Sequence, residues 1–423
     1  MTIANPESQP ERSIHWTMWY GLILLTMINV FAQMDRVALA VLLQPIKAEL
    51  LLSDAQLGLL TGPAFVLFYA TLGLPLARFA DRANRTRLLS ICLLFWSLMT
   101  TFSGFARNFP QLFLARAGVG VGEAGCLPAS YSLISDTFPR SRRTFVIAIF
   151  QCGGTIGISV GTFIVGMLTY HFGWRTCLQI VGLAGVPLSL LVFLTLREPP
   201  RPPSANSSTE STATVFRALA RRPAFIHLTV AYALHSIATS GMGQWNPSYL
   251  MRSFHLSMSD VGVWAGLATA AGSILGLLTG GLVATWLSRR DTRWELWIPA
   301  IATLIAIPFG LLLTLGPVVW IALTGKIAMS AASSVSAGVS IAAVQAFVEP
   351  HRRATAVSVV IFLNSVLGLG FGPYYIGAIS DLLMPTLGQE SLRYGMLASI
   401  IFLPWSVLHY LLASRRSARD SVD

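Results

Sequence analysis

Long apolar segments, separated by short polar turns, recur along the whole chain. A membrane-crossing helix needs about 20 apolar residues. Hydrophobic residues make up 54% of the 423 and charged residues only 11%, whereas roughly a quarter of the residues in soluble domains are charged. We therefore expect an all-α membrane protein with twelve transmembrane helices. The segments lie near residues 17–44, 56–79, 87–106, 110–137, 144–170, 174–196, 223–251, 260–287, 295–315, 317–348, 354–382 and 392–413.

One extended polar stretch divides these segments six and six. Residues 197–222, REPPRPPSANSSTESTATVFRALARR, have the Pro, Ser and Thr content of a flexible linker and end in a short amphipathic tail. We expect residues 1–196 to form one six-helix bundle and residues 223–423 a second. The polar N-terminus lacks the basic region of a signal peptide, so the first apolar segment is expected to remain as a membrane helix.

The positions of Lys and Arg predict orientation. The formal net charge is +11, but the basic residues stand between apolar segments, which is typical of membrane orientation and not of nucleic-acid binding. With both termini in the cytoplasm, 21 of the 29 basic residues lie on the inner side. Five lie outside and three within segments: Lys47, Arg107, Arg175, Arg252 and Arg393, and Arg36, Arg116 and Lys326. The sequence therefore predicts cytoplasmic termini.

The two sets of six segments also resemble each other. Two stretches with paired arginines match at a separation of 210, and the same separation relates Arg116 to Lys326. The matching stretches are FPRSRRTFVIAIF (138–150) and VEPHRRATAVSVV (348–360), and LSDAQLGLLTG (52–62) and MSDVGVWAGLA (258–268). Repeated six-helix halves with a site between them are typical of secondary transporters.

The loop ARFADRANRTR (77–87) resembles the signature of the major facilitator superfamily between its second and third spans. LARAGVGVGEAG (114–125) resembles the span-four motif of that superfamily, in which an intramembrane Arg precedes a glycine run. The fuller stretches MDRVALAVLLQPIKAEL, LGLLTGPAFVLFYATLGLPLARFADR and GVGVGEAGCLPASYSLISDTFPRSRR resemble the Spinster branch. In the second half the loop departs from the pattern, because Thr285 and Trp286 stand where an Asp-Arg pair is expected.

The resemblance implies two pseudo-symmetric six-helix bundles that rock around a central cavity, in a bacterial-type member of the inner membrane. It also implies proton-coupled transport of a lipid-like solute such as a lysophospholipid or a sphingolipid phosphate. An organic-acid or sugar-acid symporter and a multidrug exporter of the same superfamily are the alternatives. The substrate's identity and the direction of transport stay open.

Several ionisable residues lie inside apolar segments, where an unpaired charge costs several kcal/mol. Asp35 and Arg116 are both about 9–14 Å from the outer face, so we expect them to pair. Glu123 lies near the midplane, and Arg36 is rotated about 100° from Asp35 towards another neighbour. We predict that Asp35 and Glu123 couple transport to protons and that Arg36, Arg116 and Lys326 contact either the substrate or the other charges. A static salt bridge that pins the bundle is the alternative.

The second half contains different candidate functional residues. Lys326, one of two lysines in the chain, is expected to bind an anionic head group, the alternative being a side chain that reaches to the outer face. Ser333 occupies the position matching Glu123, so the acid is present in one half only. His235 is a possible proton relay or, as we favour, a packed neutral residue.

Two further sites are expected at the ends of the helices. Opposite charges at the inner end should form a cytoplasmic gate from Asp81, Arg82, Arg85, Asp136 and Arg142. In GMGQWNPSYL, the pair Asn246 and Pro247 is expected to break span seven where an outer gate would bend. Trp245 and Tyr249 beside that break are candidates for the gate or for interfacial anchors.

Other classes of protein lack their motifs here. The sequence contains no GxxxxGK[ST] loop, which a primary pump would need to bind phosphate. It also contains no HExxH, CxxC or nucleophile-elbow motif that would indicate an enzyme. The four cysteines show no metal-ligand spacing. We expect no cofactor or metal, only a proton gradient, and a monomer whose partners are protons, membrane lipids and a small amphipathic solute. A non-transporting receptor on the same fold is the remaining alternative.

Overall fold

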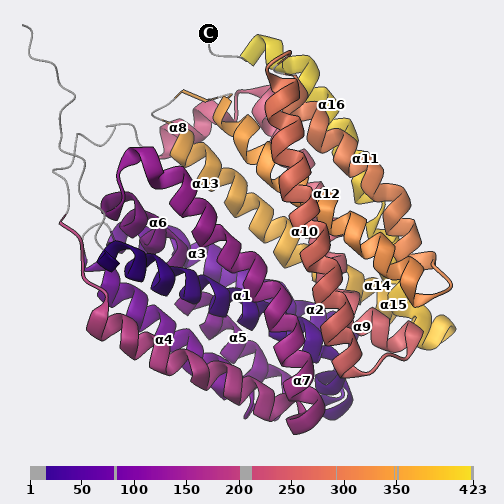
Figure 1. Ribbon diagram of the computed structural model, residues 1–423. Helices are drawn as coiled ribbons and strands as arrows, with labels where there is room; N and C mark the ends of the chain where they lie inside the picture. The colour runs from indigo at the N-terminus through magenta and orange to yellow at the C-terminus, as the bar shows by residue number, and fades with distance from the viewer. Residues whose placement is uncertain are drawn as a thin grey trace, which may run out of the picture.

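The computed structural model describes residues 16–80, 83–200, 212–291, 293–346, 348–349 and 352–420, which fold into helices joined by short connections. The first half lies beside the second, with the helices of both running in roughly one direction (Figure 1). The helices of the first half are α1 (Trp16–Leu50), α2 (Asp54–Thr61), α3 (Pro63–Ala80), α4 (Arg85–Ser103), α5 (Phe109–Glu123), α6 (Cys126–Thr137) and α7 (Arg140–Thr195).

A short helix within the expected linker, α8 (Thr212–Leu219), precedes the second half. The helices that follow are α9 (Pro223–Phe254), α10 (Met258–Ser288), α11 (Trp294–Leu315), α12 (Val319–Ala346), α13 (Arg353–Asn364), the π-helix η2 (Ser365–Phe371), α14 (Gly372–Leu387), the 3₁₀ turn η3 (Gly388–Glu390), α15 (Ser391–Ser399) and α16 (Phe402–Asp420).

These helices make twelve membrane crossings, as the sequence predicts. Eight stretches of the described chain are long and apolar enough to cross a membrane. Two of them, Phe145–Thr195 and Thr355–Arg416, hold 51 and 62 residues, two to three times the roughly 20 that one crossing needs. Each turns once, the second near Gly388, and so crosses twice. The first of these turns at Gly173, whose φ of 76° favours glycine. The remaining crossings are α5 with α6, which carries buried charges, and α9.

Successive crossings run in opposite directions, so the connections between them lie alternately at the two ends of the molecule. We call the end of the molecule that holds Trp16, α8 and α16's last turn the terminal side, and the end that holds Leu50, Gly173 and Phe254 the far side. The two halves meet through α7 against α10 and through α2 against α14. At the second contact, a Cβ on Gly377 would lie only 2.2 Å from the Asp54 carbonyl oxygen, so only glycine permits this approach.

The internal repeat is visible in matched contacts. Arg143 donates from Nε to the Phe138 carbonyl oxygen at 3.1 Å. Arg353, 210 residues later, donates from Nε to the Val348 carbonyl oxygen at 3.1 Å. Each bond joins the start of one crossing to the end of the preceding one. The repeat found in the sequence is therefore a repeat of structure.

The expectation for span seven is wrong in two respects. Helix α9 continues through Asn246 and Pro247 to Phe254 without a break, which membrane helices tolerate when neighbouring groups compensate for the lost hydrogen bond. Trp245 and Tyr249 are fully buried and are not interfacial anchors. They join helices instead, because Trp245 donates to the Pro373 carbonyl oxygen at 2.8 Å and Tyr249 to the Thr314 carbonyl oxygen at 3.1 Å.

Candidate functional site

A buried ion pair lies in the interior of the first half. Arg116 on α5 donates to an Asp35 carboxylate oxygen on α1 at 2.9 Å, and each residue is only 2% exposed. The other Asp35 oxygen accepts a hydrogen bond from the Thr100 hydroxyl on α4. The pairing expected from depth alone is confirmed, and three helices hold it.

Arg36, the next residue, turns to a different acid. Its guanidinium approaches Glu123 on α5 at 2.7 Å, and Glu123 is 1% exposed. The same guanidinium lies over the rings of Phe65 and Tyr69 on α3, 4.8 Å from each centroid. Arg36 therefore keeps favourable contacts on two sides, from a carboxylate and from aromatic faces.

The first half therefore holds two buried acids, each paired with one arginine. Each carboxylate neutralises one guanidinium, and breaking a buried pair leaves a charge without compensation. A proton on Glu123 or Asp35 would cancel the attraction and release the partner. The second carboxylate oxygen of Glu123 is buried without a hydrogen-bond partner among the described residues, so it is available to a proton. The arrangement can convert proton binding into the release of a cation.

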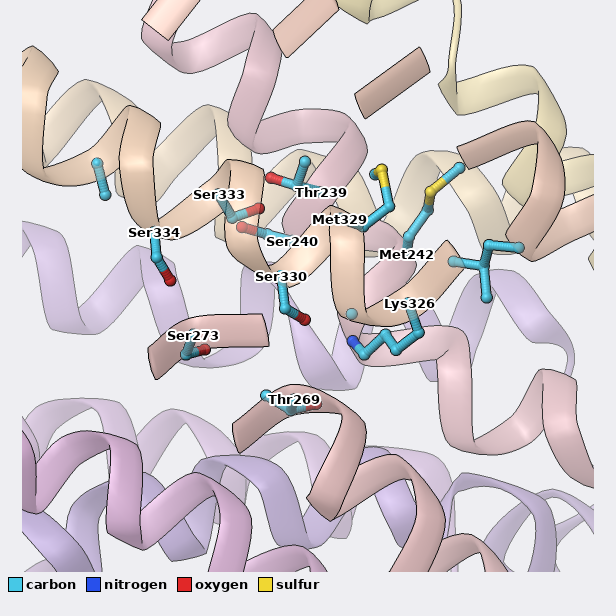
Figure 2. Close-up of a pocket in the computed structure, with 13 residues that line it drawn as sticks. Thr239, Ser240, Met242, Thr269, Ser273, Lys326, Met329, Ser330, Ser333 and Ser334 are labelled. Carbon is cyan, nitrogen blue, oxygen red and sulfur yellow. The ribbon is translucent and has the colours of Figure 1, made fainter. Parts of the chain in front are cut away.

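The second half contains an open cavity of about 280 Å³ (Figure 2). Lys326 from α12 projects into it. Lys326 is 9% exposed, and the described residues offer its ammonium no hydrogen bond or ion pair. The lining comes from α9, α10, α11 and α12: Thr239, Ser240, Met242, Gly243, Thr269, Ser273, Leu313, Lys326, Met329, Ser330, Ser333, Ser334 and Ala337. The structure thus brings Lys326 and Ser333 together.

His235 and Asn246 lie outside this lining. The Nδ1 atom of His235 is 2.9 Å from the Thr303 hydroxyl, and the imidazole is 1% exposed. Its surroundings fit a packed residue. Asn246 is 1% exposed, and neither polar atom of its amide has a partner within the described parts of the chain.

The far side holds a network that the sequence did not reveal. Asp54 on α2 is fully buried and accepts from both terminal nitrogens of Arg252 on α9, at 2.7 and 2.6 Å. It also accepts from Lys47 at 2.6 Å and from Ser380 on α14 at 2.7 Å. The sequence pointed to Asp54 only through the match between LSD (52–54) and MSD (258–260). That match shows an acid in each half but does not identify the residues that bind Asp54.

A second carboxylate completes this network across the halves. Asp381 on α14 accepts hydrogen bonds from the backbone nitrogens of Asp54 and Ala55, at 2.8 and 2.7 Å. An acid of the second half thus caps the first turn of a helix in the first half, where free backbone donors favour negative charge. These contacts close the far side.

The expected cytoplasmic gate falls on the terminal side. Arg85 bonds to Asp136 of the first half and to Glu198 at the start of the linker, the latter at 2.7 Å, and neither contact reaches the second half. Arg142 is exposed. Asp81 and Arg82 lie outside the described residues. A gate between the halves at this place stays a prediction.

Residues 25–373 match the model of the Major Facilitator Superfamily. An MFS-type efflux pump of Mycolicibacterium smegmatis is 34% identical over 411 residues, covering 96% of this chain and 94% of that protein. Protein spinster homolog 1 of Homo sapiens is 30% identical over 391 residues, covering 85% and 72%. A crystal structure of a bacterial homolog to the human lysosomal transporter Spinster, in an inward-facing and unoccupied conformation, is similar with a TM-score of 0.89 at 31% identity, covering 97% of this chain and 100% of that one.

Proposed function

We propose that this chain carries an anionic amphiphile by proton-coupled alternating access. The chain belongs to the major facilitator superfamily, as a transporter of Spinster type. The observation that carries the proposal is the contrast between two neutralised ion pairs in one half and one unpaired cation in a cavity of the other.

Alternating access is supported by the distribution of contacts between the halves. On the far side, Asp54 and Asp381 join the two halves directly. On the terminal side, Arg85 pairs within the first half and Arg222 pairs with Glu349 within the second. With the terminal side in the cytoplasm, as the Lys and Arg pattern predicts, this is the inward-facing form, the state in which the similar bacterial protein was captured. The membrane is then the bacterial inner membrane, and we assign a monomer.

Proton coupling is supported by the two buried carboxylates. Both are held by arginines in the first half, where Arg36 and Glu123 line a smaller pocket, and the matching position in the second half is Ser333. Protonation of Asp35 would free Arg116, and protonation of Glu123 would free Arg36. By linkage, a substrate that prefers the freed cations must in turn favour protonation of the acids.

An anionic solute is supported by charge. The ion pairs of the first half are neutral, so the ammonium of Lys326 is the net charge that faces the cavity among the described side chains. An apolar tail suits the methionines and leucine of the lining. The similarity to an efflux pump favours export of a hydrophobic drug as the second candidate.

Transport by purified full-length protein in proteoliposomes tests the proposal. Lysophosphatidylglycerol added to vesicles that contain a trapped pH dye should produce a pH change, and an imposed pH gradient should drive its accumulation. Asp35→Asn and Glu123→Gln should abolish both, whereas Asp260→Asn, at an exposed acid, should abolish neither. Normal pH-driven transport in both buried-acid variants would overturn the coupling. Accumulation of tetraphenylphosphonium in place of the lysolipid would support the drug exporter.

A further inference from the structure

The turn between α10 and α11 carries three arginines on the terminal side. Arg289, Arg290 and Arg293 are exposed, and none of their guanidinium groups forms an ion pair within the described parts of the chain. Asp291 stands among them, but its carboxylate accepts from the backbone nitrogen of Arg293 at 2.8 Å. Glu295 follows, half-buried, in the first turn of α11. The three guanidinium groups are therefore open to a partner from outside the chain.

The corresponding turn of the first half is built differently. It joins α3 to α4, and its Arg85 is only 2% exposed and bonds to Asp136 and Glu198. At the end of α10, Thr285 and Trp286 stand where the signature loop would place an Asp-Arg pair. The first half thus neutralises the arginine of this turn with acids of its own, and the second half does not.

An indole ring lies beneath one of the exposed arginines. The Arg290 guanidinium is 4.2 Å from the centroid of the Trp286 ring, and Trp286 is more than half exposed. Two further indoles, those of Trp294 and Trp297, pack edge to face at 5.3 Å at the start of α11. Because tryptophan at the ends of membrane helices lies at the level of the lipid head groups, the arginines stand at the depth of the lipid phosphates.

From Trp286 an apolar stripe leads along α10 into the membrane. Its members follow one another by three, four and four residues, which places them on one side of the helix. They are Leu275, Leu278, Leu282 and Trp286, and all four are more than half exposed. At 1.5 Å per residue the stripe is roughly 16 Å long, which is about half of the 30 Å hydrocarbon core and therefore the depth of one leaflet.

We infer that this surface, formed by the three arginines, Trp286 and the leucine stripe of α10, binds an anionic glycerophospholipid from the leaflet of the terminal side. The guanidinium groups donate to the phosphate in their planar fork geometry, and one acyl chain lies along the stripe. A head group without an ammonium is favoured, because like charges side by side repel each other. None of these residues lines the cavity around Lys326, so the bound lipid is distinct from the transported solute and the inference goes beyond the proposed function.

Native mass spectrometry of the full-length protein in detergent tests this site by following the bound lipid during a titration. Three arginines near the membrane surface should give phosphatidylglycerol a preference of at least about tenfold over phosphatidylethanolamine with the same chains. Glycerol phosphate and inorganic phosphate should not displace the lipid, because they have no chain to cover the stripe. Equal binding of the two lipids would overturn the selection by charge. Displacement by either soluble phosphate would show a site for a free anion in place of a lipid.

Matched pairs of adjacent arginines test whether this turn, and not basic charge in general, holds the lipid. Arg289→Gln with Arg290→Gln should weaken phosphatidylglycerol about tenfold and leave the melting temperature in lipid-free detergent unchanged. Arg415→Gln with Arg416→Gln, at exposed positions of α16 on the same side, should leave binding unchanged. Equal weakening by the two double variants would overturn the site by showing a general attraction to basic charge. Unchanged binding in the first double variant would also overturn it.

The indole and the stripe are tested separately. Trp286→Leu keeps an apolar side chain but removes the contact between guanidinium and ring, and it should weaken binding about threefold. Leu278→Ser with Leu282→Ser should weaken long-chain phosphatidylglycerol, whereas Leu277→Ser, at an exposed position on another side of α10, should not. Equal weakening at the two places would overturn the path assigned to the acyl chain. Transport of the solute with no lipid selectivity would remove this site and retain the proposed function.

Discussion

The two halves of this transporter share a helical plan but treat matching charged residues differently. Arg143 and Arg353 make the same bond to a carbonyl oxygen at the same length of 3.1 Å. Arg116 is neutralised by Asp35, whereas Lys326 at the matching position faces a cavity alone. The repeat therefore preserves contacts that hold helices together and diverges at the buried charges, one of which is paired and the other of which faces a cavity.

The same contrast appears on the far side. Asp54 and Asp260 stand in the matching LSD and MSD sequences, but Asp54 is buried among partners from both halves. Asp260 is exposed and accepts from Ser257, the N-cap residue of α10, at 2.6 Å. The two acids of the sequence repeat thus differ in place: Asp54 is the first residue of α2 and joins the halves, whereas Asp260 is the third residue of α10 and belongs to a local helix cap.

Removing the charge of Asp54 should have the largest effect. Asp54→Asn leaves Arg252 and Lys47 without their shared carboxylate, and breaking a buried pair costs about 3–5 kcal/mol. This cost falls on the state with the far side closed. Spin labels at Phe105 and Leu382, both exposed on the far side, should move apart, with the exposed Cys152 first changed to Ser. The matched Asp260→Asn should cost about 0.5 kcal/mol or less and leave the label distance unchanged. Equal distances in the two variants would show that Asp54 does not hold the halves together.

Substitutions at Arg116 and Lys326, which are related by the repeat, should have different effects on stability. We expect a large loss for Arg116 and none for Lys326. Arg116→Met strands the Asp35 carboxylate in a buried place and should cost about 3–5 kcal/mol of stability. Lys326→Met replaces a buried, unpaired cation and should leave stability unchanged or increase it. Thermal unfolding of both variants in detergent at neutral pH measures the difference. A loss of stability in Lys326→Met comparable to that in Arg116→Met would mean that Lys326 has a structural partner.

Arg143 and Arg353 should give the smallest effect, and an equal one. Each change to Ala removes one hydrogen bond to a carbonyl oxygen, which contributes about 0.5–1.5 kcal/mol. The two variants should therefore lower the melting temperature by the same few degrees and leave lysolipid binding intact. A clearly larger loss in one half would show that the repeat in this contact does not extend to its energy.

Much of this arrangement follows from local sequence. The twelve crossings follow from the apolar segments, and the turn at Gly173 lies where the prediction separated 144–170 from 174–196. The pair of Asp35 and Arg116 follows from depth, because residues at one level on neighbouring helices must satisfy each other in hydrocarbon. The second acid pair was only partly foreseen, since helical rotation turned Arg36 away from Asp35 but did not identify Glu123.

Other features depend on contacts between distant parts of the chain. Asp54 meets Arg252 and Ser380, which are 198 and 326 residues away, and no periodicity specifies such a meeting. The break expected at Pro247 is absent because the surroundings of α9 accommodate a proline that its sequence alone would place at a helix end.

The sequence by itself determined that the protein lies in a lipid bilayer, how often it crosses the bilayer, that its halves repeat, and which charged residues lie within the membrane. Each of these depends on residue type and spacing along one helix, because a bilayer admits only helices of fixed minimum length and penalises charge locally. Tertiary structure alone decided which charges are neutralised and which is left to a ligand. That outcome depends on which helices pack against each other. The packing places the Asp35 carboxylate beside Arg116, and it places a serine-lined cavity beside Lys326, the matching residue of the repeat.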